Sequence, residues 1–537
     1  MAAPMRVRTR RICRFCKFFQ TSYLRCWSSH TKRSEWKGVV GLEIHAQISA
    51  ESKLFSGACT KYGGSTNNQV SLFDAAFPGT LPAINKRCVE AGVQTALALN
   101  CHVNRVSKFD RKHYFYADLP AGYQITQLSQ PLAKGGSLRC PVFTEDVSPK
   151  RPLNYMTVGL EQIQLEQDSG KSIHNEVDQQ SLIDLNRAGV GLMEIITAPD
   201  MRSGLEAVSF LNELIGILTT ISACNCKMEE GSFRVDANIS VHRPEEPLGT
   251  RVEVKNLNSI KSVKNAIDYE IKRQTQLLQQ DKRIINDTRS FDIASGFTLP
   301  MRDKEIEQDY RFMPEPNLPP LHVYDNATVP EGLHSSQIVN IDVLQQQLPP
   351  LPAQRKEELV KNYGLPDLYA HRIVVKPGMT EFYKKVVEAR PTDPQYIAVR
   401  MMGELLGLMN KRSLEFKDVK MSPEMFGEAC DLCNLRVMSV KNFMWVLDEL
   451  LENPPSEARL NHIRQKKLTG NKDPLQLEHI CQQVLDEFEQ GSNPKKAKLK
   501  RNQENLLDYL ASQAKRKSVD VRFQSARVIL KQLLNKQ

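Results

Sequence analysis

The sequence between residues 42 and 48 is Leu42-Glu43-Ile44-His45-Ala46-Gln47-Ile48. Successive side chains of a β-strand point to opposite faces, so this segment would place Glu43, His45 and Gln47 on one face and four apolar side chains on the other. An apolar strand face must be buried against another element. The segment therefore predicts a sheet with one packed face and one polar face.

The same alternation occurs in residues 162–166, 233–241 and 251–255. The polar face would gain the following side chains: Gln162, Gln164, Glu166, Arg234, Asp236, Asn238, Ser240, Arg251, Glu253 and Lys255. For any single strand, a solvated sheet face remains the simpler interpretation. Carboxylates, one imidazole and several cations on one face instead favour a site for Mg²⁺ and nucleotide phosphates, because Mg²⁺ prefers oxygen ligands and cations neutralise phosphoryl oxygens.

The pattern changes along the chain. Residues 36–325 are strand-rich with interspersed helices, and prolines cluster at 314–320 and 349–352. After Pro352 the sequence predicts helices with short loops, and apolar residues between Val440 and Leu451 recur at helical spacing, which is typical of a core-facing stripe. We therefore expect an α+β protein in which a sheet-rich region precedes a helical one.

Charge is concentrated at the two ends of the chain. The 537 residues have a net charge of +10, and residues 1–34 contain nine Lys or Arg and no acid. This Arg-rich, acid-free composition predicts a mitochondrial transit peptide over 1–34 and a location in the mitochondrial matrix, while a basic arm that binds nucleic acid is the alternative. No stretch has the roughly 18 uncharged apolar residues that indicate a membrane span, so we expect no membrane association.

Two kinds of site are not expected from the sequence. Ser169-Gly170-Lys171-Ser172 resembles the end of a phosphate-binding P-loop, but Leu165 stands where that motif needs glycine. Twelve cysteines are present, yet Cys430 and Cys433 have no second pair nearby. Since structural zinc is held by four ligands, we expect free thiols and no zinc.

Several longer strings resemble the B subunits of the glutamyl-tRNA(Gln) amidotransferases, the GatB family. They include Val40-Gly41-Leu42-Glu43-Ile44-His45, Tyr114-Phe115-Tyr116-Ala117-Asp118-Leu119-Pro120, Arg234-Val235-Asp236-Ala237-Asn238-Ile239-Ser240, Glu253-Val254-Lys255-Asn256-Leu257-Asn258-Ser259 and Asp309-Tyr310-Arg311. The resemblance is dense from about residue 37 to 325 and continues weakly to the end.

The resemblance implies a domain plan. Residues 35–330 would form a cradle domain with an antiparallel sheet similar to that of glutamine synthetase and guanido kinases. Residues 331–385 would form an all-α linker domain, and residues 386–537 a helical tail domain of the YqeY-like type that binds tRNA.

The resemblance also implies a reaction that uses ATP and Mg²⁺. Proteins of this family phosphorylate the side chain of glutamate carried on mischarged Glu-tRNA(Gln), and ammonia then displaces the phosphate to give Gln-tRNA(Gln) for mitochondrial translation. Such a ligase takes its ammonia from an amidase-type A subunit that hydrolyses glutamine, and a small C subunit completes the heterotrimer. The alternatives are a non-catalytic tRNA-binding scaffold in the same complex and a stand-alone enzyme that acts on free glutamate.

Site residues are carried over by position. The metal would be held by Glu43, His45, Glu166 and Glu194, ATP would be bound by Lys171, Arg187 and Arg234, and the catalytic set would be Asp236, Asn238, Arg251, Glu253, Lys255 and Arg311. Two positions depart from the family pattern, because Gln167 replaces an acid and Gln164 replaces a histidine. Either Glu166 takes the role of the missing acid, or fewer charges hold the Mg²⁺.

The basic tail is the expected RNA-binding surface. Residues 491–537 contain twelve Lys or Arg and three acids, and phosphate contacts dominate affinity for RNA. A lysine run is also common on a solvated face, but the resemblance favours contact with tRNA. The predicted RNA-binding residues are Lys495, Lys496, Lys498, Lys500, Arg501, Lys515, Arg516 and Lys517.

Overall fold

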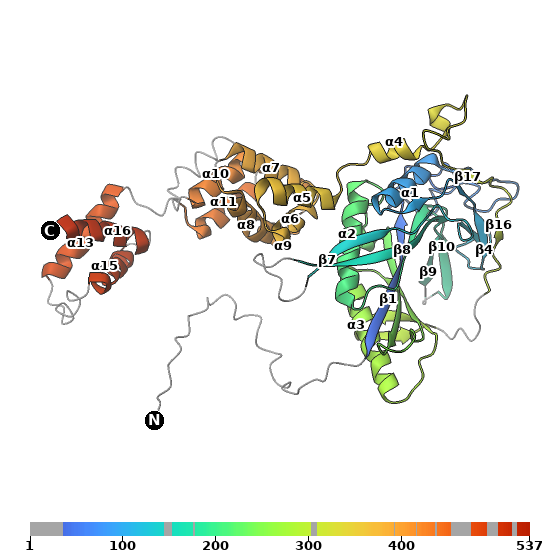
Figure 1. The fold of residues 1–537 in the computed structure, drawn as a ribbon, viewed down its shortest axis with the longest axis horizontal. Coiled ribbons are helices and arrows are strands. Elements are labelled where there is room, and N and C mark those ends of the chain that lie inside the picture. Colours follow the sequence, from blue (N-terminus) through green and yellow to red (C-terminus); the bar gives the residue numbers. More distant parts are fainter. Residues whose placement is uncertain are drawn as a thin grey trace.

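The computed structural model describes residues 36–143, 153–175, 178–301, 309–390, 392–414, 416–434, 438–452, 474–490, 503–517 and 523–536. A sheet-rich region comes first and helices follow it along the chain, as the sequence predicts (Figure 1). The predicted transit peptide at 1–34 lies outside the described residues.

The first region contains a ten-stranded sheet. Its strands, in spatial order, are β15 (Phe297–Pro300), β14 (Thr288–Asp292), β13 (Val252–Leu257), β12 (Phe233–His242), β1 (Lys37–Gln47), β11 (Gly191–Thr197), β8 (Asn154–Gln167), β6 (Ala133–Lys134) and β2 (His102–Val103), with β7 (Ser137–Val142) also paired to β8. Every pairing is antiparallel except that of β13 with β14, which is parallel. The long β1 lies near the middle, so its polar residues face neighbours on both sides.

Shorter pairings complete this region. They are the hairpin of β9 (Lys171–Asn175) with β10 (Gln180–Asp184), the three-stranded sheet of β16 (Met313–Pro314), β4 (Asp110–His113) and β5 (Tyr123–Thr126), and the pair of β3 (Val106–Ser107) with β17 (Leu321–His322). Short helices lie at η2 (Met228–Glu230), η3 (Ser335–Gln337) and α4 (Ile341–Gln346).

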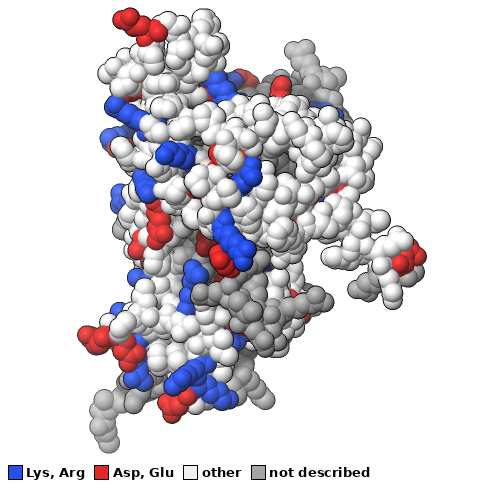
Figure 2. All heavy atoms as spheres, turned by 90° about the vertical axis from the view of Figure 1, so that its right-hand side faces the viewer, with Lys and Arg blue, Asp and Glu red and all other residues white. Residues whose placement is uncertain are grey.

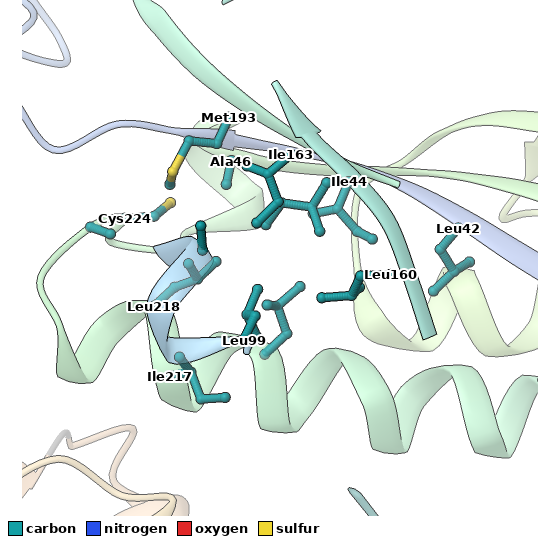
Figure 3. Close-up of a cluster of buried hydrophobic side chains, with 14 of the residues drawn as sticks. Leu42, Ile44, Ala46, Leu99, Leu160, Ile163, Met193, Ile217, Leu218 and Cys224 are labelled. Atoms are coloured by element: carbon teal, nitrogen blue, oxygen red, sulfur yellow. The ribbon is translucent and has the colours of Figure 1, made fainter. Parts of the chain in front are cut away.

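Helices cover the apolar face of the large sheet. They are α1 (Lys86–Ala98), α2 (Gly204–Thr220) and α3 (Ile260–Gln279), and each begins after a side-chain cap, at Asn85, Ser203 and Ser259 respectively. Leu42, Ile44 and Ala46 are at most 1 % exposed in the resulting core. Figure 3 shows these side chains along the strands, and Ile217 and Leu218 of α2 belong to the same apolar cluster. The predicted packed face of β1 is confirmed.

A second hydrophobic core lies in the helices after Pro352. The elements are α5 (Pro352–Tyr363), α6 (Asp367–Val374), α7 (Met379–Ala389), α8 (Pro394–Arg400), the π-helix η4 (Met401–Leu405), α9 (Leu406–Lys411), η5 (Phe416–Asp418), α10 (Pro423–Asn434) and α11 (Val440–Glu452). Phe443, Leu447 and Leu450 of the predicted stripe are buried in this core. The core runs from Leu359 to Leu450, so the predicted boundary between residues 385 and 386 falls inside it, within α7.

A third core is formed by α13 (Pro474–Gln490), α15 (Gln503–Lys517) and α16 (Phe523–Lys536). Leu485, Leu507, Leu510 and Leu530 are at most 1 % exposed there. These three helices therefore make a small helical unit with its own apolar centre. No helix in the described part of the chain is long and apolar enough to cross a membrane.

Candidate functional site

The polar face of the large sheet brings side chains from four strands into rows. His45 of β1 pairs with Glu194 of β11 on one side and with Arg234 of β12 on the other. Glu43 pairs with Asp236 of β12 one row away. Directly opposed residues of an antiparallel pair have their Cβ atoms about 5 Å apart, so the register alone places acidic groups side by side.

Side chains from β1, β8 and β11 converge closely on this face. One ligand atom from each of His45, Glu166 and Glu194 lies within 4.8 Å of the others. His45 Nδ1 is 3.2 Å from Glu166 Oε1, and Thr126 donates a hydrogen bond to the other Glu166 oxygen, also at 3.2 Å. Gln164 donates its amide to Glu194. We call His45, Glu166 and Glu194 the acidic triad.

All three side chains of the acidic triad have shifted pKa values. Burial opposes protonation of His45, but the hydrogen bond to Glu166 and the nearby carboxylates raise its pKa to about 9. Burial also acts against ionisation of Glu166, yet contact with His45 lowers its pKa to about 2. Burial and the charge of Glu166 raise the pKa of Glu194 to about 8. These shifts favour the charged forms of His45 and Glu166 and the neutral form of Glu194.

A second group continues along the sheet toward β13. Asn238 donates a hydrogen bond to Glu43 over 2.8 Å. Lys255 lies 2.9 Å from Glu253 and 3.5 Å from Asp236. Burial acts to lower the pKa of Lys255, but these two carboxylates outweigh it and raise the pKa, so the ammonium keeps its charge. Predicted catalytic residues on neighbouring strands are thus in contact with one another.

Arg234 and Arg187 meet at Asp168, just beyond the end of β8. Arg234 contacts the Asp168 carboxylate at 2.9 Å, and Arg187 lies 3.6 Å from it. Arg187 also donates to the carbonyl oxygens of Ser169 and Gly170, so its guanidinium holds this turn. A cavity of about 240 Å³ adjoins Asp168 and Gln167 and is lined also by the 119–121 turn and Gly189.

Three predicted site residues lie outside these contacts. Arg251 is exposed and precedes β13, Lys171 is exposed at the start of β9, and the Arg311 side chain is 84 % exposed. Arg251 precedes the first residue of β13, so the alternation of that strand does not fix the direction of its side chain. Arg311 has a left-handed backbone with φ of 43° and lies beside β4 instead.

Gln167 points away from the acidic triad, toward β5. Its side-chain oxygen accepts a hydrogen bond from the backbone N–H of Ile125 at 3.1 Å, whereas Glu166 lies in the acidic triad. Of the two alternatives, the placement therefore favours Glu166 in the role of the missing acid.

Sequence reasoning missed four residues at or near the site. Asp168 joins Arg187 and Arg234, and Lys112 of β4 helps to lower the pKa of both Glu166 and Glu194. Lys53 and Asp74 form a buried ion pair at 3.2 Å beside the same cavity. An acid two residues after Glu166 was a usable signal for Asp168, but nothing local marks Lys53 or Lys112.

Only part of the predicted RNA-binding surface is described. Lys515, Arg516 and Lys517 are exposed in the last turn of α15, and Lys517 contacts Glu487 of α13. Lys495, Lys496, Lys498, Lys500 and Arg501 lie outside the described residues.

The sequence matches two family profiles in the same order as its structural regions. The profile for the GatB/GatE catalytic domain matches residues 38–328, more than half of the chain, and that for the GatB domain matches residues 381–533. The chain belongs to the GatB family. The first match contains every residue of the acidic triad and the whole polar face.

Similarity to individual members of the GatB family extends over most of the chain. This chain is 46 % identical, over 85 % of its length, to the B subunit of the mitochondrial glutamyl-tRNA(Gln) amidotransferase of Homo sapiens, and the match covers 82 % of that protein. The corresponding mitochondrial protein of Aedes aegypti is 43 % identical, with 90 % of each chain covered. The B subunit of the aspartyl/glutamyl-tRNA(Asn/Gln) amidotransferase of Rickettsia felis is 39 % identical, with 90 % of this chain and 94 % of that protein covered.

Proposed function

We propose that this chain is the B subunit of a mitochondrial glutamyl-tRNA(Gln) amidotransferase, and that it uses ATP and Mg²⁺ to activate glutamate carried on mischarged Glu-tRNA(Gln). The observation that carries the proposal is the acidic triad next to the Glu43–Asn238 and Asp236–Lys255–Glu253 contacts. A polar set of this density on a half-buried sheet face opposes stability, which is the pattern of a site kept for chemistry.

The acidic triad fits a divalent cation. Two carboxylates and one imidazole supply ligands from three adjacent strands, and the oxygen atoms suit Mg²⁺. The raised pKa values of His45 and Glu194 favour their protonated forms, and a bound dication would replace those protons. When bound, Mg²⁺ would neutralise charge on the phosphates of ATP during transfer.

Two residues of the polar face carry a buried polar atom that could still form a hydrogen bond. Asn238 Oδ1 and Arg234 Nε are buried without a hydrogen-bond partner among the described residues. A buried polar atom without a partner costs roughly 1–3 kcal/mol, so such atoms are expected where a substrate completes the hydrogen bonds. Arg234 and Lys255 would neutralise phosphoryl oxygens, and Asn238 would orient Glu43.

The reaction has two parts. The glutamate side-chain oxygen attacks the terminal phosphorus of ATP and releases ADP, which turns a poor oxide leaving group into a phosphate. Ammonia then attacks the acyl carbon, phosphate leaves, and the excess proton of ammonia is lost. We propose that an amidase-type A subunit supplies the ammonia from glutamine and that a small C subunit joins the complex. The complex would act in the mitochondrial matrix.

We propose further that the large sheet is related to the cradle of glutamine synthetase and guanido kinases. The helical unit around α13, α15 and α16 would be the YqeY-like tail that contacts tRNA through its basic residues. The family membership and the order of the two profile matches support both proposals.

The test uses the complete complex, prepared with its A and C subunits, with ATP, glutamine and Glu-tRNA(Gln). Glu166→Gln and Glu43→Ala should abolish ADP release and Gln-tRNA formation while tRNA binding is retained. Glu245→Gln, which changes an exposed acid after β12, is the matched control. ADP release on free glutamate without tRNA would instead indicate a stand-alone enzyme.

A non-catalytic scaffold is the second candidate, and Gln167 favours it because its amide replaces an acid of the family pattern. The same experiment separates the two functions. Unchanged turnover in both active-site variants, with tRNA binding intact, would establish the scaffold.

A further inference from the structure

A group of aromatic rings, three of them exposed and two half-buried, lies near the candidate site. Tyr114, Phe115 and Tyr116 follow β4, and Tyr310 and Phe312 precede β16, the neighbouring strand. We call these five residues the aromatic platform. Phe115 is 86 % exposed, Tyr116 58 % and Phe312 40 %. A contiguous exposed apolar patch often marks a binding site.

The rings of the aromatic platform are in contact across the two segments. The centroid of Tyr114 lies 5.6 Å from that of Tyr116 and 6.1 Å from that of Tyr310, and Tyr310 lies 6.1 Å from Phe312. His113 fixes the second segment by donating its backbone N–H to the carbonyl oxygen of Tyr310 at 2.9 Å. Phe115 rests on Gly122, where a Cβ would come within 3.0 Å of the ring. The platform is thus a built surface rather than a set of isolated rings.

Positive charge is interleaved with the rings. The Lys112 ammonium lies 4.7 Å from the ring centroid of Tyr310 and 6.0 Å from that of Tyr114. The Arg311 side chain, between Tyr310 and Phe312, is 84 % exposed. Figure 2 looks onto the side of the first region where β4 and β16 lie, and it shows Lys and Arg side chains beside acidic ones near the middle of that face.

Two hydrogen bonds lead from the platform to the residue next to Glu166 of the acidic triad. Tyr114 donates its hydroxyl to Gln124, and Gln124 donates to the carbonyl oxygen of Gln167, the residue after Glu166. Lys112 of β4 is paired in register with Gln124 of β5, so it lies beside the same hydrogen bonds. A molecule lying on the rings would therefore extend toward the carboxylates.

We propose that the aromatic platform stacks the unpaired 3′-terminal bases of the tRNA and so brings the aminoacyl ester to the acidic triad. Exposed aromatic rings interleaved with Lys and Arg are the usual surface for single-stranded nucleic acid, since every base has a face that can stack. The ester is attached to the terminal nucleotide, so the base nearest to it must lie close to the reacting carboxylate.

The open geometry favours RNA over the adenine of ATP. A single nucleotide gains most from a slot that covers both faces of its base, whereas these rings are spread over two segments and exposed to solvent. A polynucleotide crosses such a surface with several bases. This inference rests on the proposed function, because it assigns a subsite for the same substrate.

The experiment measures stacking directly in the complete complex. A tRNA(Gln) with 2-aminopurine in place of its terminal adenine should lose fluorescence on binding, and Phe115→Ala with Tyr116→Leu should reduce that loss. The same variant should raise the KM for Glu-tRNA(Gln) about tenfold, the size expected for losing a base stack. It should leave the KM for ATP unchanged, and Tyr116→Phe should behave as wild type.

Two controls keep the result specific. Phe297→Ala removes a ring that is 52 % exposed on β15, at one edge of the large sheet and outside the small sheet of β4 and β16, and should change nothing. A tRNA that lacks its unpaired 3′ nucleotides should bind equally to the wild type and to the platform variant.

Other results would overturn the inference. A rise confined to the KM for ATP would assign the rings to the nucleotide. Loss of the A subunit on purification would assign them to a protein interface. If the proposed function were wrong, the wild-type complex would form no Gln-tRNA. If only this inference were wrong, the wild-type complex would be active, and the platform variant would match it in turnover and in the loss of fluorescence.

Discussion

The two faces of β1 contrast sharply although their residues alternate along one strand. Leu42, Ile44 and Ala46 are at most 1 % exposed and pack under the helices, and burying a large apolar side chain contributes roughly 1.5–3 kcal/mol. Glu43 and His45 point the other way, into carboxylates and cations. One strand therefore both stabilises the fold and holds groups whose burial opposes it.

This contrast explains why the site can be polar and still rigid. Each polar residue is fixed by apolar neighbours at i−1 and i+1 that have no room to move. A substitution on one face should change chemistry with little effect on folding, and one on the other face should do the reverse. Variants of β1 and its neighbours can test that separation.

After the complete loss expected for Glu166→Gln and Glu43→Ala, the largest effect is expected for Glu194→Gln. The pKa of Glu194 is raised to about 8 by burial and by the charge of Glu166, so its carboxyl is mostly protonated at neutral pH, and glutamine copies that neutral form. Turnover should fall roughly 10²–10⁴-fold, the range for losing an electrostatic contact in an active site, while the Tm changes little. Calorimetry and Gln-tRNA formation, compared with Glu245→Gln, measure both.

Ile44→Ala should give the opposite result. Ile44 is 0 % exposed and packs in the first core, and removing such a side chain costs about 2–5 kcal/mol. We expect unfolding to reach its midpoint at a lower urea concentration, while turnover per folded molecule stays within about fivefold of wild type. If turnover fell as far as in Glu194→Gln, the two faces would not be separable.

The sequence predicted the faces but not the register. Alternation alone assigned Glu43, His45, Asp236 and Asn238 to one face, and each lies there. That His45 stands between Glu194 and Arg234 depends on which strands pair and in what offset, and these interactions join residues more than 140 positions apart. Local pattern carries no such information.

Two predicted site residues lie outside the strands, where the alternation gives no information. Arg251 lies one residue before β13 and Arg311 in a left-handed turn, and at such positions side-chain direction is set by the turn rather than by period two. Lys112 was overlooked because its strand, Asp110–His113, is short and belongs to a separate small sheet. The aromatic platform was visible only as family strings, since its two segments are about 195 residues apart.

A buried acid on the apolar side offers a pH test of the contrast. Glu213 of α2 is 7 % exposed, lies 3.7 Å from His371 of α6, and faces Lys356. Burial raises the pKa of Glu213 to about 7 and lowers that of His371 to about 4. Because 3.7 Å exceeds a hydrogen bond and both groups favour their neutral forms, they do not form an ion pair between pH 5 and 7.

The pH dependence of stability is set by the direction of the Glu213 shift. Its folded-state pKa of about 7 exceeds the ordinary value of 4.5, so its contribution to stability is complete below pH 4.5 and is lost as the pH rises to about 7. Glu213→Gln should therefore be more stable than wild type by roughly 1–3 kcal/mol at pH 8, with most of this difference absent at pH 5. Equal Tm differences at both pH values would contradict the burial argument.

Surface charge should give the smallest effect, since water screens it. Lys515→Gln with Arg516→Gln removes two exposed cations from the last turn of α15, and Lys517 is retained because it contacts Glu487. We expect tRNA affinity to fall about three- to tenfold, and the slope of log affinity against log salt to decrease by about 2, one for each lost phosphate contact. Filter binding between low and physiological salt measures both quantities.

Lys361→Gln, which removes an exposed lysine of α5 that contacts Glu357 at 2.8 Å, is the control and should leave the slope unchanged. An equal slope in both variants would mean that α15 does not contact the phosphates, and the RNA-binding surface would then have to lie elsewhere on the chain.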